Sequence, residues 1–376
     1  MIIAVNTRML QLNKMEGIGY FAFESFKRIV KLHPEHEFVF IFDRPYDSSF
    51  IFSDNIKGVY LSPAARHPIL WYIWYEWSLA RFLKKLKPDI FVSPDGYLPL
   101  SIKSKTLAVI HDINFEHYPE DLPFFNRIYY RYFFSRFAKK ATRISTVSEF
   151  SKKDISETYN ISDSKIDVVY NGAGEEFKPV SENKMTEIRA RYSLGKPYFI
   201  FIGSLHRRKN IANLLKAFDI FQKDSGAGFK ILLAGTKRWW TEDMEQAYQN
   251  MTYKADVIFT GRVSDSDLQE LTASAFALTY VSLFEGFGIP IIEAFRCDVP
   301  VITSNTTSMP EIAADAAYLV DPFSVEEIAK AMKELYQNEA LKNKLIEKGR
   351  TRKMSFNWDK TAEDLWQSMM KACKSE

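Results

Sequence analysis

The chain has 376 residues, 46% of them hydrophobic and 26% charged, values typical of a globular protein long enough for two domains. Its 50 lysines and arginines nearly balance 47 acids, for a net charge of +3, which argues against a nucleic-acid partner. Two cysteines, Cys297 and Cys373, predict no disulfide framework and favour the reducing cytoplasm. The N-terminus lacks the features of a signal peptide, and no run of about 18 apolar residues could span a bilayer.

Strand-like and helix-like patterns alternate along the first half of the chain. Short runs rich in β-branched residues lie at residues 2–5, 38–42, 90–92, 107–110, 144–147 and 166–169. Amphipathic stretches such as residues 20–32 and 69–86 separate them. This alternation predicts a parallel sheet with helices on both faces. From residue 172 to 197 the pattern gives way to polar sequence and one short helix, so we expect a first domain over residues 1–178.

The same alternation returns in the second half. Its strand-like runs lie at residues 198–202, 230–234, 257–260, 277–281, 300–303 and 317–320. A helical pattern over residues 358–370 follows the last run. The sequence therefore predicts an α/β chain of two doubly wound, Rossmann-like domains, residues 1–178 and 179–355, with a tail helix in residues 356–376.

Ligands of open parallel sheets bind outside the carboxyl ends of the strands, so the residues after each strand are candidates. After residues 198–202 comes GSLHRRKN. Gly203 would let the backbone approach a ligand, and Arg208 and Lys209 stand where the next helix should begin. Cations there oppose the helix dipole unless an anion is bound, and a diphosphate would suit them. A solvated basic turn explains the segment equally well.

A second candidate loop follows the strand at residues 277–281 and reads FEGFGIPIIEAF, residues 284–295. Gly286 and Gly288 permit positive φ, and the proline after them suits the first turn of a helix. The backbone amides of Phe287, Gly288 and Ile289 could then face a phosphate.

Two acids flank this loop, Glu285 and Glu293. A phosphate would repel them, so we expect them to accept hydrogen bonds from hydroxyl groups. A ligand with a diphosphate between two polyhydroxylated rings needs this combination, which predicts a nucleotide sugar. The alternative is that Glu285 only favours the helix dipole and Glu293 lies at the surface.

These segments closely resemble the large group of retaining glycosyltransferases with the GT-B fold. The likeness rests on residues 203–210, on EGFGIPIIE at 285–293, and on VPVITSNTTSMPEIAADAAYLVDP at 299–322. In the first half it rests on His111 with Asp112, on TVSEFSKKDI at 146–155 and on EGIG at 16–19. The last of these resembles the family's glycine-containing loop after the first strand, so we expect Gly17 and Gly19 to lie in a loop. One departure is Val281, which stands where the family often has a proline before the serine.

The resemblance implies roles for individual residues. Glu285 would bind the hydroxyls of the donor sugar and Glu293 the ribose, while Arg208 and Lys209 would hold the diphosphate and stabilise its growing charge. His111 would lie near the reacting sugar. The implied donor-binding set also contains Gly17, Gly19, Gly203, Arg262, Val263, Phe287, Gly288 and Ile289. The tail helix would cross back to the first domain, as in the family.

Metal-binding patterns are weak in this chain. Asp265-Ser266-Asp267 looks like the metal-holding pair of other sugar transferases, but Ser264 and Asp267 also form a capping-box-like helix start, which we favour. His111, Asp112 and His117 lack further residues with ligand spacing. We therefore expect no metal and no cofactor, with Arg208 and Lys209 neutralising the diphosphate.

Residues 67–87 and 124–143 mix aromatic rings with lysines and arginines. Such helices can lie against an anionic membrane or receive a lipid-linked sugar. They can also be core packing with solvated basic edges, which we favour, and their rings can stack on sugars.

The sequence thus predicts a retaining, metal-independent glycosyltransferase that moves a sugar from a nucleotide donor to a carbohydrate or lipid-linked acceptor. The second half leans toward a mannosyltransferase of surface-polysaccharide assembly, working in the cytoplasm or on the inner face of the membrane. The alternatives are a non-catalytic nucleotide-sugar-binding protein and a sugar-nucleotide epimerase of the same fold.

Overall fold

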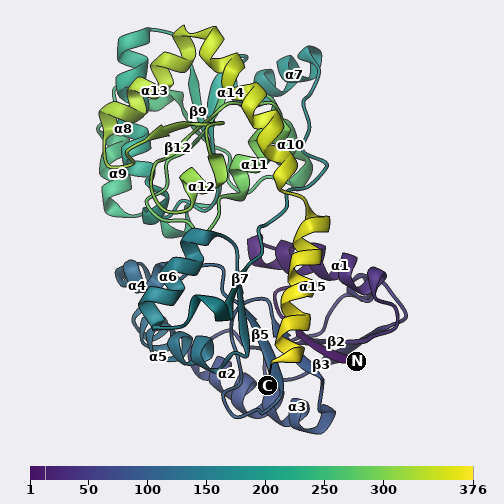
Figure 1. Cartoon of the computed structure of the whole chain (residues 1–376). Helices are drawn as coiled ribbons and strands as arrows, with labels where there is room; N and C mark the ends of the chain where they lie inside the picture. Colours follow the sequence, from purple (N-terminus) through teal and green to yellow (C-terminus); the bar gives the residue numbers. More distant parts are fainter. Residues whose placement is uncertain (13, 376) are drawn as a thin grey trace. The chain divides into compact units, whose positions relative to one another are not determined.

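The computed structural model describes residues 1–12 and 14–375, which form two compact units (Figure 1). Unit 1 contains Met1–Gly172 together with Trp358–Glu376, and unit 2 contains Ala173–Asn357. The chain changes unit a few residues away from the boundaries expected at residues 178 and 355, because the polar stretch after residue 172 is itself the connection. Within the described part of the chain, no helix is both long and apolar enough to cross a bilayer.

Unit 1 is built on a seven-stranded parallel sheet with the order β3-β2-β1-β4-β5-β6-β7. The strands are β1 (Ile2–Asn6), β2 (Glu37–Phe42), β3 (Ile56–Tyr60), β4 (Ile90–Ser93), β5 (Lys105–Val109), β6 (Arg143–Thr146) and β7 (Ile166–Val168). The central strands are buried on both faces, which explains their nearly continuous apolar sequences. Strand β3 was not predicted, because it is a half-exposed edge strand with a glycine at residue 58.

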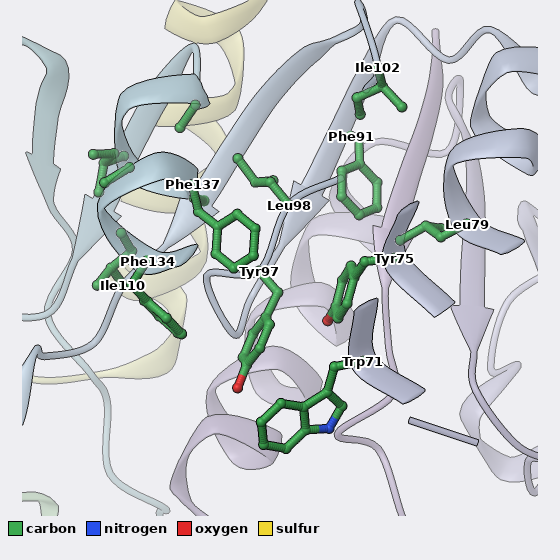
Figure 2. Packing of buried hydrophobic residues seen from close by; sticks show 14 of the residues in the cluster. Trp71, Tyr75, Leu79, Phe91, Tyr97, Leu98, Ile102, Ile110, Phe134 and Phe137 are labelled. Carbon is green, nitrogen blue, oxygen red and sulfur yellow. The ribbon is translucent and has the colours of Figure 1, made fainter. Parts of the chain in front are cut away.

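Helices cover the sheet of unit 1. They are α1 (Gly17–Leu32), α2 (Pro68–Ile73), α3 (Ala80–Leu86), α4 (Asn114–His117), α5 (Phe124–Lys140) and α6 (Glu149–Tyr159), with short 3-10 turns at η1 (Ser48–Phe50), η3 (Pro119–Asp121) and η4 (Asp163–Lys165). The helix expected at residues 69–86 contains a π-helical segment, η2 (Trp74–Leu79), between α2 and α3. Rings from this region and from α5 form a buried cluster with Tyr97 and Leu98 (Figure 2).

The last helix of the chain, α15 (Trp358–Lys374), packs on unit 1 against α1, β4, β5 and β6. Its Thr361 hydroxyl donates to the carbonyl of Tyr170 at 2.7 Å, and Lys371 pairs with Asp167 at 2.9 Å. The tail helix therefore returns to the first unit, as the family resemblance implied.

Unit 2 has a six-stranded parallel sheet with the order β10-β9-β8-β11-β12-β13. The strands are β8 (Tyr198–Ile202), β9 (Lys230–Ala234), β10 (Val257–Phe259), β11 (Ala277–Tyr280), β12 (Val301–Ser304) and β13 (Tyr318–Val320). The helices are α7 (Glu182–Ser193), α8 (Ile211–Ser225), α9 (Glu242–Gln249), α10 (Asp265–Ala273), α11 (Ile289–Arg296), α12 (Met309–Ala313), α13 (Val325–Gln337) and α14 (Glu339–Arg352). Short 3-10 turns lie at η5 (Arg207–Lys209), η6 (Lys237–Trp239), η7 (Lys254–Asp256) and η8 (Lys353–Ser355). The predicted fold, two Rossmann-like units with a C-terminal helix, is confirmed.

Candidate functional site

The predicted site residues of unit 2 follow two strands that are neighbours in its sheet. In the sheet, β9 and β10 continue on one side of β8, and β12 and β13 continue on the other side of β11. The strand order therefore changes direction between β8 and β11, and ligands of open α/β sheets bind at such a switch point. Gly203, Arg208 and Lys209 come after β8, and residues 284–293 come after β11. The strand order therefore brings two loops far apart in sequence to the same crevice edge.

Asn210 ties these two loops together. Its backbone is left-handed, with φ of 61°, and its side chain donates hydrogen bonds to the carbonyls of Val281 at 3.0 Å and Pro322 at 2.6 Å. The amide of Leu283 donates in turn to the carbonyl of Arg208 at 2.8 Å. Asn210 was not among the predicted site residues, although an asparagine directly before a helix often makes stabilising contacts there.

Glu285 stands at the centre of a buried ionic cluster. Arg208 Nη1 lies 3.0 Å from Glu285 Oε1, and Lys209 Nζ contacts the same oxygen. Lys209 Nζ also donates to the Tyr280 hydroxyl at 2.6 Å, and Arg208 Nη1 to the Phe284 carbonyl at 3.2 Å. Glu285 and Lys209 are buried, whereas the side chain of Arg208 is 23% exposed. Tyr280, which sequence reasoning missed, helps to hold the lysine in place.

The electrostatics of this cluster fix its protonation states. Burial alone would raise the pKa of Glu285, but the charges of Arg208 and Lys209 outweigh it and lower that pKa to about 2. Burial raises the pKa of Tyr280 well above its ordinary value. Burial and the two cations lower the pKa of His206 to about 4. At neutral pH the cluster therefore holds two cations and one carboxylate, with Tyr280 and His206 neutral.

The loop after Glu285 turns directly into α11. Gly288 has φ of 103°, in the region that favours glycine, and α11 begins at Ile289. The Ser308 hydroxyl donates to the carbonyls of Glu285 at 2.8 Å and Phe287 at 3.2 Å, which holds the turn. The N-terminal end of α11, which carries the positive end of the helix dipole, therefore follows Glu285 directly.

Glu293 lies one turn further along α11 and is half-buried. Burial, with smaller contributions from the charges of Glu176 and Asp265, raises its pKa to about 8. The two glutamates of one motif thus differ in protonation state at neutral pH. Glu293 is thus intermediate between full burial and the surface position considered for it.

The remaining unit 2 candidates lie at two places. Gly203, with φ of 139°, follows β8 directly, and its amide donates to the Ala234 carbonyl at 2.9 Å. Arg262 and Val263 follow β10, the edge strand, which β9 separates from β8. Arg262 is exposed and Val263 is half-buried.

The acidic pair at residues 265–267 opens helix α10. The Ser264 hydroxyl accepts from the Asp267 amide at 3.1 Å, and Asp267 pairs with Arg191 at 3.2 Å. The capping interpretation is therefore confirmed. Among residues 1–12 and 14–375, the one group of metal-capable side chains close enough to share an ion is His33, Glu35 and His36, between α1 and β2.

His111 follows β5 in unit 1. Its Nε2 donates to the Pro94 carbonyl at 3.0 Å, and its ring meets Phe21 edge-on at 5.0 Å. Burial lowers the pKa of His111. Next to it, the Asp112 carboxylate accepts from the backbone amide of Asn114, the first residue of α4, at 3.0 Å. The imidazole is therefore neutral and held in one orientation.

The glycines near the start of unit 1 were expected in a loop, but they lie in a helix. Gly17 is the first residue of α1 and Gly19 lies in its first turn. A Cβ on Gly19 would lie 2.9 Å from the Met9 carbonyl oxygen and 3.3 Å from Met15 Cβ. Gly19 thus permits the segment before α1 to pack closely on the helix start.

A buried ion pair that sequence reasoning missed lies at the switch point of unit 1, between β1 and β4. Arg8 Nε donates to Asp95 Oδ2 at 2.5 Å, and the Asn6 amide donates to Asp95 Oδ1 at 2.9 Å. The guanidinium lies 4.6 Å from the ring centre of Tyr97. Because Asp95 follows Pro94, this network also braces the carbonyl that accepts from His111.

Outside these sites, a hollow of about 460 Å³ lies between α8 and α9. Lys216, Asp219 and Asp243 are among the residues that line it, and it contains none of the predicted site residues. The carboxyl ends of the strands therefore remain the candidate site.

Two families match the two halves of the chain. Residues 18–176 match the family described as Glycosyltransferase Family 4, and residues 184–352 match Glycosyl transferases group 1. A similar relative is O-antigen chain mannosyltransferase B of Escherichia coli, 28% identical over 357 residues, which cover 92% of this chain and 93% of the relative. O-antigen chain mannosyltransferase RfbU of Salmonella typhimurium is 29% identical over 72% of this chain and 71% of its own.

Solved structures share the whole fold. Sucrose-phosphate synthase from Thermosynechococcus elongatus superposes with a TM-score of 0.77 at 17% identity, covering 98% of both chains. Anabaena HepE, solved in complex with UDP and glucose, gives a TM-score of 0.75 at 14% identity over 98% of this chain and 99% of its own. The chain therefore belongs to the GT-B glycosyltransferases, with a family 4 domain in its first half and a group 1 domain in its second.

Proposed function

We propose that this glycosyltransferase moves mannose from a nucleotide-sugar donor to a growing polysaccharide or lipid-linked acceptor, with retention of the anomeric configuration and without a metal. The relatives named as O-antigen chain mannosyltransferases support the sugar and the product class. The structure of HepE with UDP and glucose supports the class of donor.

The observation that carries the donor proposal is the cluster of Arg208, Lys209 and Glu285 beside the first turn of α11. Two fixed cations beside the N-terminal end of a helix suit a diphosphate. An ionised carboxylate next to them suits sugar hydroxyls, which donate hydrogen bonds to it. Glu293, one helical turn away, is assigned to the ribose, and Gly203 lets the backbone approach the phosphates. We assign Arg262 and Val263 to the nucleobase.

The chemistry follows from these assignments. The bond between the anomeric carbon and the diphosphate oxygen breaks, and its electron pair goes to that oxygen. The acceptor hydroxyl oxygen bonds to the anomeric carbon on the same face and gives its proton to the leaving phosphate. The transition state is oxocarbenium-like. Arg208 and Lys209 stabilise the charge that grows on the diphosphate, a contribution of about 3 kcal/mol for one such group in a dry site.

His111 has a separate role in the proposal. Its Nε2 is committed to the Pro94 carbonyl, so the unprotonated Nδ1 is left as an acceptor for a hydroxyl of the reacting sugar. The enzyme would act in the cytoplasm, on the inner face of the membrane where a lipid-linked acceptor is presented.

The experiment starts from the donor. A panel of nucleotide sugars is screened by thermal unfolding, since a bound ligand raises the stability of the folded state. The stabilising donor is then incubated with and without lipid-linked and oligosaccharide acceptors, and released nucleotide is measured. We expect release only with an acceptor, and a product whose anomeric configuration by NMR matches that of the donor. An inverted product contradicts retention, turnover of the sugar nucleotide without acceptor indicates an epimerase, and binding without any turnover indicates a non-catalytic protein.

A further inference from the structure

The outer side of α5 carries large apolar side chains that face solvent. Phe124, Phe125, Ile128 and Tyr132 are between 52% and 67% exposed. Residues 124, 128 and 132 are spaced by four, so they form one stripe along the helix. On the opposite side of the same helix, Phe134 and Phe137 are buried, which makes the helix apolar on both sides.

A second exposed stripe runs along α2 and η2. Ile69, Ile73 and Trp77 are again spaced by four, with Tyr72 beside them, and Trp77 is 69% exposed. Here too the opposite side is buried, since Trp71, Trp74 and Tyr75 point into the cluster.

The two stripes belong to one surface. The ring of Tyr72 lies 6.0 Å from that of Phe133 on α5. Beneath it, Trp71 meets Tyr129 at 5.2 Å and Tyr130 at 5.8 Å. Figure 2 shows Trp71 beside Tyr75 and Tyr97 on this inner side. Helix α3 continues η2, buries Ala80 and Leu83 in the same cluster and exposes Arg81, Lys84 and Lys85. We call the exposed side of α2, η2, α3 and α5 the aromatic–basic face. Because the inner rings lock the helices together, the outer rings stand on a rigid support.

Positive charge concentrates around this face. Residues 66–87 and 124–140 each contain five lysines and arginines, and together they contain one acid, Glu76. These segments thus carry an excess of nine positive charges, while the whole chain carries +3. Glu76 is turned inward, since its carboxylate accepts from the Leu100 amide at 2.5 Å. The Arg136 guanidinium lies 3.6 Å from the ring centre of Tyr132, so cations and rings share the surface.

We propose that the aromatic–basic face docks unit 1 on the surface of an anionic lipid bilayer. Aromatic rings at the level of the headgroups and basic side chains near anionic lipids are the combination that holds amphipathic helices at a membrane interface. An acidic protein partner would need no stripe of exposed phenylalanines, and a second copy of this chain would bring the same positive charge against itself. The inference deepens the proposed function, because it places the enzyme where a lipid-linked acceptor is found.

Vesicle flotation with the full chain tests the proposal. The probes are vesicles of phosphatidylcholine with and without phosphatidylglycerol. We expect flotation with the anionic vesicles at low salt, loss of flotation as salt rises because exposed charges are screened, and a blue shift of tryptophan emission from Trp77. Binding to free nucleoside diphosphate is measured in parallel, so that a failure of the donor site is seen separately.

Two variants separate the two parts of the face. Phe125→Ser with Trp77→Ser removes exposed rings, and we expect the partition coefficient to fall at least tenfold. The matched control is Phe323→Ser with Leu194→Ser, whose side chains in unit 2 are 66% and 77% exposed. The charge variant replaces four exposed basic residues by glutamine, Arg81, Lys84, Lys139 and Lys140. We expect about a fivefold loss for each charge removed.

The control for the charge variant replaces four exposed lysines of unit 2 by glutamine, Lys223, Lys254, Lys330 and Lys344. It should float as the wild type does. Flotation that is unchanged in both face variants, or equal loss in the variants and their controls, overturns the proposal. So does a dimer in sedimentation that Phe125→Ser with Trp77→Ser abolishes, because a second copy then covers the face.

Discussion

Two glutamates separated by seven residues experience opposite environments. Glu285 is buried between two cations, which lower its pKa to about 2. Glu293 is desolvated on α11 near Glu176 and Asp265, and its pKa rises to about 8. Environment rather than residue type therefore sets what each can do, and the difference leads to two tests.

The first test separates the roles of the two acids. Glu293→Ala should weaken binding of both the intact donor and the free nucleoside diphosphate by about ten- to a hundredfold, as expected for a lost charged hydrogen bond. Glu285→Ala should leave nucleoside diphosphate binding nearly normal, while transfer falls by a similar factor or more. Titration calorimetry with both ligands measures this. Equal losses of nucleoside diphosphate affinity would show that the roles are divided wrongly.

The second test uses the raised pKa of Glu293. In the free protein the group is largely protonated at about pH 7. Accepting hydrogen bonds from ribose hydroxyls favours the carboxylate, so binding should lower the pKa and release a proton. Calorimetry in buffers of different ionisation enthalpy counts released protons, and Glu293→Gln corrects for protons that come from the phosphate.

The same shift has a consequence for stability. Because the folded-state pKa of Glu293 is raised, the unfolded chain loses its proton first, so the group destabilises the fold increasingly as pH rises from its ordinary pKa to about 8. Glu293→Gln should therefore unfold at a higher temperature than the wild type at pH 8 and at the same temperature at pH 4. If the wild type and Glu293→Gln release the same number of protons on binding and show the same pH dependence of unfolding temperature, the raised pKa does not belong to Glu293.

How far the site could be predicted depends on sequence distance. The residue types and their places after strands led to the prediction that Arg208, Lys209, Glu285 and Glu293 are site residues. Their mutual contacts could not be predicted, because 76 residues separate Lys209 from Glu285 and only the order of strands brings them together. Asp95 and Arg8 were missed for the same reason.

At the scale of elements, helix α10 decides between two interpretations of one short motif. Ser264 caps the helix and Asp267 is committed to the cap and to Arg191. We predict that Ser264→Ala lowers the free energy of unfolding by about 1 kcal/mol and leaves transfer unchanged.

Lys209→Ala should slow transfer at least tenfold, and wild-type transfer should survive excess EDTA. Activity lost in EDTA and restored by manganese would return residues 265–267 to consideration as a metal site.

Strands and helices could be predicted from the sequence where one hydrophobic periodicity dominates a segment. The central strands are short, β-branched and buried on both faces, and all were found. The edge strand β3 was missed, since half of it is exposed and its sequence IKGVY lacks a clear pattern. The glycines at residues 17 and 19 were placed in a loop on the family resemblance, whereas they lie in α1, where close packing on residues 9–15 requires glycine at position 19.

At the scale of the whole molecule, both units share one feature, a buried ion pair at the switch point of the sheet. In each sheet the first strand of the unit lies beside its fourth strand, and the strand order changes direction between them. These pairs are β1 with β4 and β8 with β11. Each switch point holds a buried cation paired with a carboxylate, Arg8 with Asp95 in unit 1 and Lys209 with Glu285 in unit 2. Unpaired charges there would be strongly destabilising, so the loops at both sites are held in one arrangement.

Unit 1 combines residues from both ends of the chain, Met1–Gly172 and Trp358–Glu376. Its stability should therefore depend on the C-terminal helix. Helix α15 buries Leu365, Met369 and Trp366 on unit 1 and stacks Trp366 on His33 at 3.7 Å. Burying one large apolar side chain contributes about 1.5–3 kcal/mol, so losing this helix removes an amount comparable to the stability of a whole domain, about 5–15 kcal/mol.

Deletion of residues 358–376 should therefore unfold unit 1 while unit 2 stays folded. The expected result is a thermal transition of unit 1 that is lost or shifted to a much lower temperature, with the transition of unit 2 in place. Deletion of residues 375 and 376 alone is the control and should change neither transition. A peptide of residues 358–374 added to the shortened chain should restore unit 1, because it returns the buried side chains without the covalent link. A shortened chain that unfolds as the full chain does would mean that α15 covers the sheet without stabilising it.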